Sequence, residues 1–207
     1  MNFRPAFIVL EGGEGSGKST QVARVAAQLR ALGADVVETF EPGGTALGAR
    51  LRELLLHNDD AVDPRAELLL LASDRAQHVE EVIAPALEAG AVVVCDRYSP
   101  STLAYQGVAR GLGVDIVEDV CRFAEGDIEP DVVVVLDVSD EVALERASAD
   151  PDRLERAGAE FHATVRQAYR DLAARKGWTV IDGSGPVDVV FANVWAAVAP
   201  FVEPPSP

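Results

Sequence analysis

The sequence has little cysteine and no long apolar run, and these absences exclude several classes of protein. Its two cysteines, Cys95 and Cys121, are too few for a disulfide framework, and we expect both to be small buried side chains. Its three histidines lack the spacing of metal ligands, which argues against a structural metal site. No apolar run approaches the roughly 20 residues of a membrane-spanning helix. We therefore expect neither a disulfide scaffold nor a membrane protein.

Positive charge is also scarce. The chain has 18 Lys and Arg residues against 34 Asp and Glu residues, which gives a net charge of −16. This charge repels nucleic acid at long range, and no basic stripe offsets it, so no nucleic-acid partner is expected. A nucleotide site can still form, because a few arginines, backbone N–H groups and Mg²⁺ act locally. The composition therefore favours small-molecule partners.

The length of 207 residues suits one domain with a substantial core. We expect this domain to cover residues 1–202 and the proline-rich tail, residues 203–207, to be disordered. No cleavable leader is expected, because cutting near the N-terminus would remove the glycine-rich loop described below. We therefore expect a cytoplasmic protein.

Short β-rich runs alternate along the chain with helix-patterned stretches. Three of the runs are nearly continuous Val, Ile and Leu, as in parallel strands that are buried on both faces. This alternation predicts a three-layer α/β fold, a five-stranded parallel sheet flanked by helices. The expected strands are Ala6–Glu11, Asp35–Phe40, Ala91–Asp96, Asp131–Asp137 and Trp178–Asp182. The expected helices are Lys18 to about Leu32, Ala46–Leu56, Pro64–Glu88, Thr102–Arg110, Asp115–Glu125, Glu141–Ala147, Arg153–Arg175 and Val187–Val198.

A glycine-rich loop lies between the first predicted strand and the first predicted helix. It reads GGEGSGKS and satisfies the phosphate-loop pattern G-x-x-x-x-G-K-[ST] in the context that the pattern requires. Its backbone N–H groups would surround phosphate oxygens, Lys18 would reach the β- and γ-phosphates, and Ser19 would ligate Mg²⁺. The loop predicts a P-loop NTPase that binds ATP through Gly12, Gly13, Glu14, Gly15, Ser16, Gly17, Lys18, Ser19 and Thr20.

The third predicted strand ends in Asp96-Arg97-Tyr98, and this end should face the same crevice as the phosphate loop. Asp96 would then lie across from Ser19 and hold Mg²⁺, partly through water. Arg97 would present a guanidinium that suits a phosphate group. A phosphate loop by itself is equally typical of GTPases, motors and kinases. The absence of an N-K-x-D guanine signature argues against a GTPase switch.

Several further motifs, taken together, resemble those of the thymidylate kinase family. The resemblance covers about residues 6–185 and includes a lid expected at about 146–157, of the bacterial type in which the lid supplies arginines. The motifs, in order, are Glu41-Pro42-Gly43-Gly44-Thr45, Asp74-Arg75-Ala76-Gln77-His78, Asp96-Arg97-Tyr98, Ala104-Tyr105-Gln106-Gly107 and Asp152-Arg153-Leu154-Glu155.

The resemblance implies an acceptor site. Arg75 and Arg97 would bind the acceptor's phosphate, and Tyr105 would lie near the deoxyribose and crowd a 2′-hydroxyl. Ser101 and Thr102 would bond the base edge with Gln106 close by, and Glu14 would contact the acceptor sugar or help to position Mg²⁺. The helical spacing of Ser101, Thr102 and Tyr105 independently puts them on one face.

The chain departs from the family's pattern at two positions and in the lid. Leu71 stands where the family has a phenylalanine that stacks on thymine, and it shares a helix face with Arg75. Phe40 replaces an arginine before Glu-Pro-Gly-Gly-Thr. The lid is short and acidic in its middle, and Arg153 is our first candidate for its catalytic arginine, followed by Arg146 and then Arg156.

The expected reaction is transfer of the ATP γ-phosphoryl group to dTMP, giving dTDP and ADP for DNA-precursor synthesis. Lys18, Arg97, Arg153 and Arg146 are the expected catalytic residues. Two alternatives stay open: a kinase relaxed toward dUMP or another pyrimidine acceptor, and a catalytically weakened P-loop paralogue that only binds nucleotide. Family resemblance also implies a homodimer, for which the apolar helix Pro64–Glu88 is the candidate interface.

Overall fold

Five parallel strands form one sheet in the computed structural model of the chain, which describes residues 3–57, 61–146 and 151–202. The strand order is β2-β3-β1-β4-β5, so β1 is central and the phosphate loop leaves its carboxyl end. All five predicted strands are confirmed, with their ends within one residue. Their bounds are Ala6–Gly12 for β1, Val36–Phe40 for β2, Val92–Asp96 for β3, Val132–Asp137 for β4 and Thr179–Asp182 for β5.

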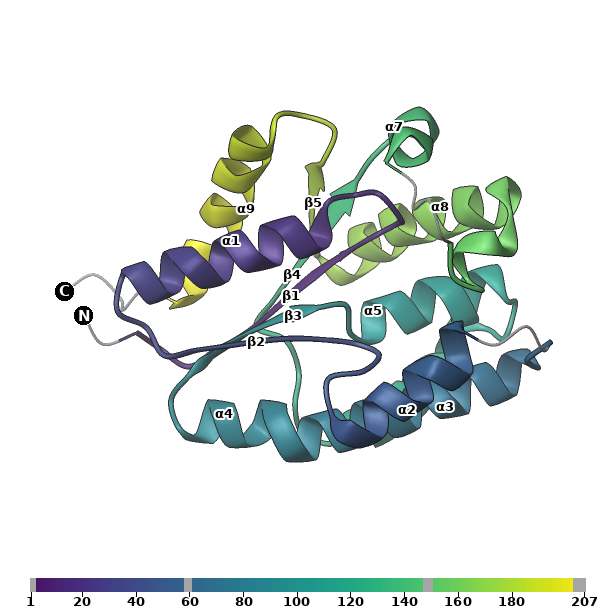
Figure 1. Ribbon diagram of the computed structural model, residues 1–207, viewed down its shortest axis with the longest axis horizontal. Helices are drawn as coiled ribbons and strands as arrows, with labels where there is room; N and C mark the ends of the chain where they lie inside the picture. The colour runs from purple at the N-terminus through teal and green to yellow at the C-terminus, as the bar shows by residue number, and fades with distance from the viewer. Residues whose placement is uncertain (1–2, 58–60, 147–150, 203–207) are drawn as a thin grey trace.

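Two helices, α1 (Lys18–Ala31) and α9 (Val187–Val202), cover one face of the sheet (Figure 1). Their inward side chains recur at helical spacing, for example Val190, Val194 and Val198. They pack on alternate residues of β1, including Ile8 and Leu10, while the intervening strand residues face the other way. Both faces of the central strands are therefore buried, which explains their continuous apolar sequence.

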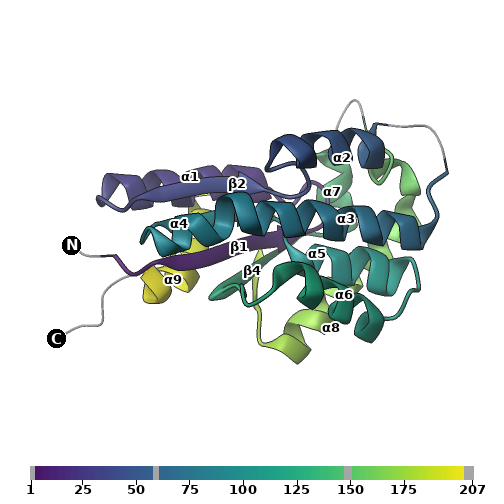
Figure 2. The same ribbon diagram turned by 90° about the horizontal axis from the view of Figure 1, so that it is seen from below.

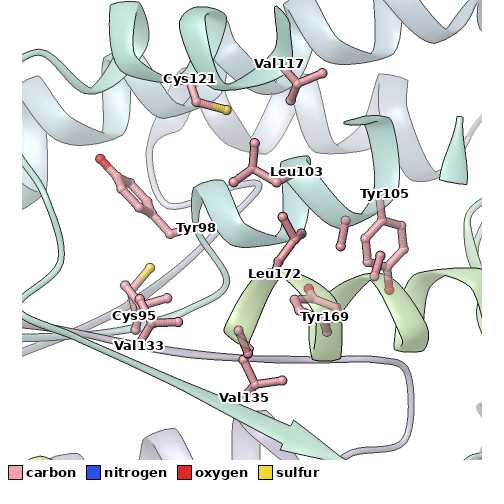
Figure 3. Packing of buried hydrophobic residues seen from close by; sticks show 14 of the residues in the cluster. Cys95, Tyr98, Leu103, Tyr105, Val117, Cys121, Val133, Val135, Tyr169 and Leu172 are labelled. Carbon is pink, nitrogen blue, oxygen red and sulfur yellow. The ribbon is translucent and has the colours of Figure 1, made fainter. Parts of the chain in front are cut away.

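The opposite face carries the remaining core, which Figure 3 shows from close by. The predicted helix Pro64–Glu88 is confirmed as one uninterrupted helix with a π-helical turn in its middle. Tyr98, Leu103, Tyr105 and Tyr169 fill the space between the sheet and the covering helices. These helical segments are α3 (Pro64–His78), η1 (Val79–Ile83), α4 (Ala84–Glu88), α5 (Ser99–Thr102), η2 (Leu103–Ala109), α6 (Val114–Glu125) and α8 (Ala159–Lys176).

A smaller group of segments surrounds the carboxyl edge of the sheet. It comprises α2 (Ala46–Leu56), which lies beside α3 in Figure 2, α7 (Asp140–Glu145) and the short 3₁₀ helix η3 (Glu155–Ala157). Thr45 caps α2, because its side chain accepts a hydrogen bond from the amide of Gly48. The predicted bounds of α2 are confirmed.

The prediction of a helix over Arg153–Arg175 is wrong at its start, because α8 begins at Ala159. Gly158 separates α8 from η3 with a φ of 95°, which an L side chain rarely adopts. The carboxylate of Asp152 accepts from the amides of Leu154 and Glu155, and that of Glu155 accepts from the amide of Asp152. This reciprocal capping gives the end of the lid a compact turn of its own.

Two predictions fall on residues outside the described ranges, the tail 203–207 and the lid residues 147–150. In the part of the chain that the structure describes, no helix has the length and apolar character to cross a bilayer.

Candidate active site

A cavity of about 690 Å³ opens at the carboxyl edge of the sheet. Its walls come from the phosphate loop, the end of β3, α3, η2 and the lid segment Asp152–Glu155. Arg146 and Arg153, the predicted lid arginines, are not part of its described lining. The cavity brings together most of the predicted site residues: Glu14, Lys18, Ser19, Leu71, Arg75, Asp96, Arg97, Ser101, Thr102, Tyr105 and Gln106.

The phosphate loop is held in shape by its own side chains and by the strand beside it. The Lys18 ammonium donates to the carbonyl of Gly13 at 2.8 Å, and the Ser16 hydroxyl donates to the same carbonyl at 2.9 Å. A Cβ at Gly12 would lie 2.3 Å from the carbonyl oxygen of Leu136 in β4, so only glycine fits. The loop is therefore a backbone cradle that exists before a ligand arrives.

The ammonium of Lys18 is in an unusual electrostatic setting. Burial and, second to it, the positive charge of Arg97 lower its pKa to about 8. An anion in the cradle would favour the charged form and raise this pKa again. Lys18 is thus suited to a polyanion such as a triphosphate.

Ser19 and Asp96, the predicted metal residues, lie in direct contact. The Ser19 hydroxyl donates to Oδ2 of Asp96 at 2.6 Å, across 77 positions of sequence. An exposed hydroxyl and a carboxylate at the mouth of a phosphate cradle fit Mg²⁺, which prefers oxygen ligands and takes the rest from phosphate and water. The described residues hold no cluster of three or more His, Cys, Asp or Glu suited to a metal, so the chain supplies only part of such a site.

Arg97 is fixed at the boundary between the phosphate loop and the acceptor side. It has a φ of 71° and is the one non-glycine residue with positive φ in the described chain. Its Nη1 donates to the carbonyl of Gly12 at 3.1 Å, the hydroxyl of Ser101 at 3.0 Å and the hydroxyl of Tyr169 at 3.3 Å. The guanidinium also lies over the ring of Tyr105, 5.4 Å from its centroid. All of these direct partners are neutral, so Arg97 keeps its positive charge available for an anion.

The acid that supports Arg97 is Glu11, at the end of β1. It is fully buried and accepts from the hydroxyls of Ser101 at 2.6 Å and Tyr169 at 2.8 Å, and from the amide of Tyr98 at 2.8 Å. Burial raises the pKa of Glu11, while Arg97 and these hydrogen bonds oppose the rise. Glu11 therefore orients the partners of Arg97 without pairing with it directly.

Arg75 lies deeper, and its side chain is only 2% exposed. Its guanidinium pairs with the carboxylate of Glu41 at 2.9 Å and donates to the hydroxyl of Thr102 at 3.0 Å. The other oxygen of Glu41 lies 2.9 Å from Nδ1 of His78. Arg75 thus reaches the cavity as one member of a buried and charge-paired network.

The base side of the predicted acceptor site is formed by α3, α5 and η2. Leu71 lines the cavity with Arg75, as their shared helix face predicts. Ser101 and Thr102 also line it, but both hydroxyls are engaged, Ser101 with Glu11 and Thr102 with Arg75. Gln106 donates through Nε2 to the buried carboxylate of Glu67 at 2.6 Å.

The three predicted lid arginines have different partners. Arg146 lies against the phosphate loop, where its guanidinium donates to the carbonyls of Gly15 at 3.4 Å and Gly183 at 3.0 Å. Arg153 instead pairs with Glu67 at 2.6 Å, and Arg156 donates to the carbonyl of Pro151 at 3.0 Å. The first choice from sequence, Arg153, is therefore not at the phosphate loop in this structure, whereas Arg146 is.

Sequence reasoning missed the buried acids and one arginine that support the site. Glu11 ends an apolar strand and Glu67 lies in an apolar helix, and a lone charge in such a setting is the signal that could have found them. Arg166 of α8 packs its side chain under the phosphate loop, where its Cγ would be 3.2 Å from a Cβ at Gly13, and it pairs with Asp140. The 3.6-residue spacing of α8 alone gives no hint of that contact.

Comparison with known proteins gives concordant results. A family model described as thymidylate kinase matches residues 10–194. The thymidylate kinase of Deinococcus radiodurans is 46% identical over 197 residues, which cover 93% of this chain and 96% of that protein. The thymidylate kinase of Synechococcus sp. strain JA-2-3B'a(2-13) is 50% identical, and the match covers 94% of each. The crystal structure of Ehrlichia chaffeensis thymidylate kinase superposes with a TM-score of 0.79 at 30% identity and covers 95% of this chain and 99% of that one.

Proposed function

The chain belongs to the thymidylate kinase family and transfers the γ-phosphoryl group of ATP to dTMP, and we propose that the phosphate loop holds the donor while Arg97 holds the acceptor's phosphate. The observation that carries this division is that Lys18 and Ser19 line the same cavity as Arg97 and Tyr105. The donor and the acceptor would therefore meet between Lys18 and Arg97.

On the donor side, the amides of the phosphate loop and the Lys18 ammonium bind the β- and γ-phosphates. Ser19 and Asp96 would hold Mg²⁺, which neutralises charge on the phosphates when it is bound. The contact between the two side chains, at 2.6 Å, supports a shared role. The loop is preformed by its own hydrogen bonds, so little reorganisation accompanies binding.

On the acceptor side, the Arg97 guanidinium orients an oxygen of the dTMP phosphate for in-line attack on the γ-phosphorus. This oxygen is already ionised, so no general base is required. Tyr105 stacks under Arg97, and we assign to it the exclusion of a 2′-hydroxyl. Leu71, which also lines the cavity, would supply apolar contact to the base. The sequence also predicted that Arg75 binds the acceptor's phosphate. Because its charge is already paired with Glu41, we assign Arg75 instead to the base side of the pocket, beside Leu71.

Among the lid arginines, we assign stabilisation of the transferred phosphoryl group to Arg146. Its guanidinium already donates to the carbonyl of Gly15 in the phosphate loop, which would bind the donor's phosphates. The lid would then exclude water and add positive charge at the same time.

The acceptor is tested by ADP release with dTMP, dUMP, UMP and dCMP at saturating ATP. The highest kcat/KM is expected for dTMP. The pair dUMP and UMP differs only in the 2′-hydroxyl. A kcat/KM that is higher for dUMP than for UMP, with a smaller ratio in Tyr105→Ala, would support the role of Tyr105. Equal rates for dUMP and UMP in the unaltered enzyme would contradict it. Turnover of dUMP that equals that of dTMP would favour a relaxed pyrimidine kinase.

We also propose that the enzyme is a cytoplasmic homodimer. Cys95 and Cys121 are free thiols, which suits a reducing compartment. Exposed apolar side chains on α3 and α6, namely Leu69, Ile116 and Phe123, offer a surface for a second copy. Sedimentation equilibrium of the protein and of Phe123→Asp tests this, and a monomer for both would contradict it.

A further inference from the structure

Glu67 is a fully buried carboxylate on α3 that accepts from four donor atoms on three residues, two at the end of η2 and one in the lid. Oε1 accepts from Nε2 of Gln106 at 2.6 Å and from Nε of Arg110 at 3.3 Å. Oε2 accepts from Nη2 of Arg153 at 2.6 Å and from Nη2 of Arg110 at 3.4 Å. A carboxylate has about four acceptor positions, so Glu67 is saturated. Such an acid costs too much to bury unless these partners are present.

Arg153 is the partner that comes from the lid, and it is tied down at several points. Its Nε donates to the carbonyl of Leu55 at 2.7 Å, and its backbone amide donates to the carbonyl of Leu56 at 3.0 Å. Both carbonyls belong to the last turn of α2, where helices leave such groups unsatisfied. Together with the pair to Glu67, these bonds fasten the lid segment to α2 and α3 at once.

The segment that Arg153 fastens forms one wall of the acceptor cavity. Asp152, Leu154 and Glu155, its immediate neighbours, all line the cavity. The reciprocal capping of Asp152 and Glu155 makes this stretch a compact unit, and Nε2 of His162 bonds with the carbonyl of Glu155 at 2.9 Å. Movement at Arg153 would therefore move this wall as a whole.

The same carboxylate also fixes groups on the opposite wall. Because Glu67 can only accept, Gln106 must present its Nε2 to it, and this sets the orientation of the amide. Arg110 lies over the ring of Phe161 at 4.7 Å, and Phe161 meets Tyr105 edge to face at 6.0 Å. Glu67 thus connects the lid with the residues that we assign to the nucleoside.

We propose that Glu67 and Arg153 form a latch that holds the lid against the acceptor pocket, so that Arg153 positions the pocket wall and does not act on the transferred phosphoryl group. This inference rests on the proposed acceptor role of the cavity. Arg153 and Glu67 are positioning residues in this scheme. Loss of the latch would weaken dTMP binding while leaving the chemical step nearly intact.

The test compares Arg153→Gln, Arg153→Lys and Glu67→Gln with the unaltered enzyme by initial rates at varied dTMP and saturating ATP. Loss of binding that is equal in the ground and transition states raises KM without lowering kcat. We expect KM for dTMP to rise about tenfold in Arg153→Gln and Glu67→Gln, with kcat within about threefold. Arg153→Lys keeps a cation for Glu67 and should recover part of the affinity. The double variant that combines Arg153→Gln with Glu67→Gln should have a KM for dTMP no higher than that of the single variants, because both substitutions remove the same contact.

A binding measurement separates the latch from the reaction. Calorimetry of dTMP with each variant should give a Kd that rises in parallel with KM, whatever the turnover. Failure of the unaltered enzyme to turn over dTMP would contradict the proposed function. The calorimetric comparison would still show whether the Glu67–Arg153 contact supports dTMP binding. Arg24→Gln, which removes an ion pair with Asp188 between two residues that do not line the cavity, is the matched control and should change neither quantity.

Two outcomes would overturn the latch. A loss of about a hundredfold or more in kcat for Arg153→Gln, with KM and Kd for dTMP unchanged, would return Arg153 to the phosphoryl group. Kinetic and binding constants within twofold of the unaltered enzyme would show that the contact positions nothing. Thermal unfolding of each variant identifies a fold defect. Such a defect is not expected in Arg153→Gln, because Glu67 keeps its ion pair with Arg110.

Discussion

Two of the arginines that line the cavity, Arg97 and Arg75, have similar sequence contexts and differ in the charge of their partners. Each follows an aspartate, and each lies on an element that the family resemblance assigns to the acceptor. Arg97 donates directly only to a carbonyl and two hydroxyls, whereas Arg75 pairs directly with the carboxylate of Glu41. An anion therefore meets a guanidinium without a direct ion pair at Arg97 and a guanidinium that is already paired at Arg75. The direct partners of an arginine therefore decide whether it can bind an anion as much as its position does.

Removal of Arg97 should produce the largest effect on activity. We expect Arg97→Gln to lower kcat/KM for dTMP about 10³-fold, because it removes preorganised positive charge at the reacting phosphate. Steady-state assays with a parallel measurement of ATP affinity will check this. ATP affinity should stay near that of the unaltered enzyme. Retention of more than a tenth of kcat/KM would contradict the assignment of the acceptor's phosphate to Arg97.

Removal of Arg75 should instead act first on the fold. Arg75→Gln leaves the carboxylate of Glu41 buried without its cation, which should lower the free energy of unfolding by about 3 kcal/mol. Urea denaturation measures this change. The double variant Arg75→Gln with Glu41→Gln should be less destabilised than Arg75→Gln alone. Equal destabilisation of Arg97→Gln and Arg75→Gln would mean that charge balance does not separate the two sites.

The titration of Lys18 gives a sharper test of which arginine faces the phosphate loop. Its pKa is about 8, lowered by burial first and by Arg97 second, so it is partly deprotonated at pH 8. ATP should raise this pKa and cause uptake of about half a proton at pH 8, which calorimetry in buffers of different ionisation enthalpy can measure. Activity that depends on charged Lys18 falls as pH rises through this pKa in the free enzyme. Arg97→Gln should reduce the uptake, and Arg75→Gln should not.

The smallest expected effect concerns Leu71, the neighbour of Arg75 on the base side. Leu71→Phe adds an aromatic face where thymine is expected and should tighten dTMP binding by about 1 kcal/mol, close to fivefold. Calorimetry with dTMP and dUMP measures it. Leu71→Met serves as the control for side-chain bulk, and tightening by methionine as large as that by phenylalanine would exclude a stacking contribution.

Local patterns predicted the parts of the molecule that local physics determines. The five strands follow from continuous apolar runs, and the proximity of Ser19 and Asp96 follows from the shared edge of parallel strands. The start of α8 could not be placed in this way, because helix periodicity continues through Arg153 while Gly158 interrupts the backbone.

The partners of the buried acids were also beyond reach of the sequence. Glu67 meets Arg153 across 86 positions, and Glu11 meets Tyr169 across 158, so each pairing depends on how whole helices pack. The roles of Arg146 and Arg153 also depend on how the lid packs. Both are lid arginines in the sequence, and only their contacts, Arg146 with Gly15 and Arg153 with Glu67, distinguish them. A charged residue at an apolar position could have indicated that a polar partner lies opposite it, but not which residue that partner is.

The left-handed backbone at Arg97 limits which substitutions this position can accept without loss of activity or stability. A side chain other than glycine in this conformation costs about 1 kcal/mol, and only asparagine and aspartate reduce that cost appreciably. Glycine, asparagine or aspartate would lower the conformational free energy at this position but would remove the guanidinium. Lysine would retain a positive charge, but it would also retain the conformational cost. In the proposed mechanism, a substitution at residue 97 that relieves this backbone strain therefore gains stability and loses catalysis.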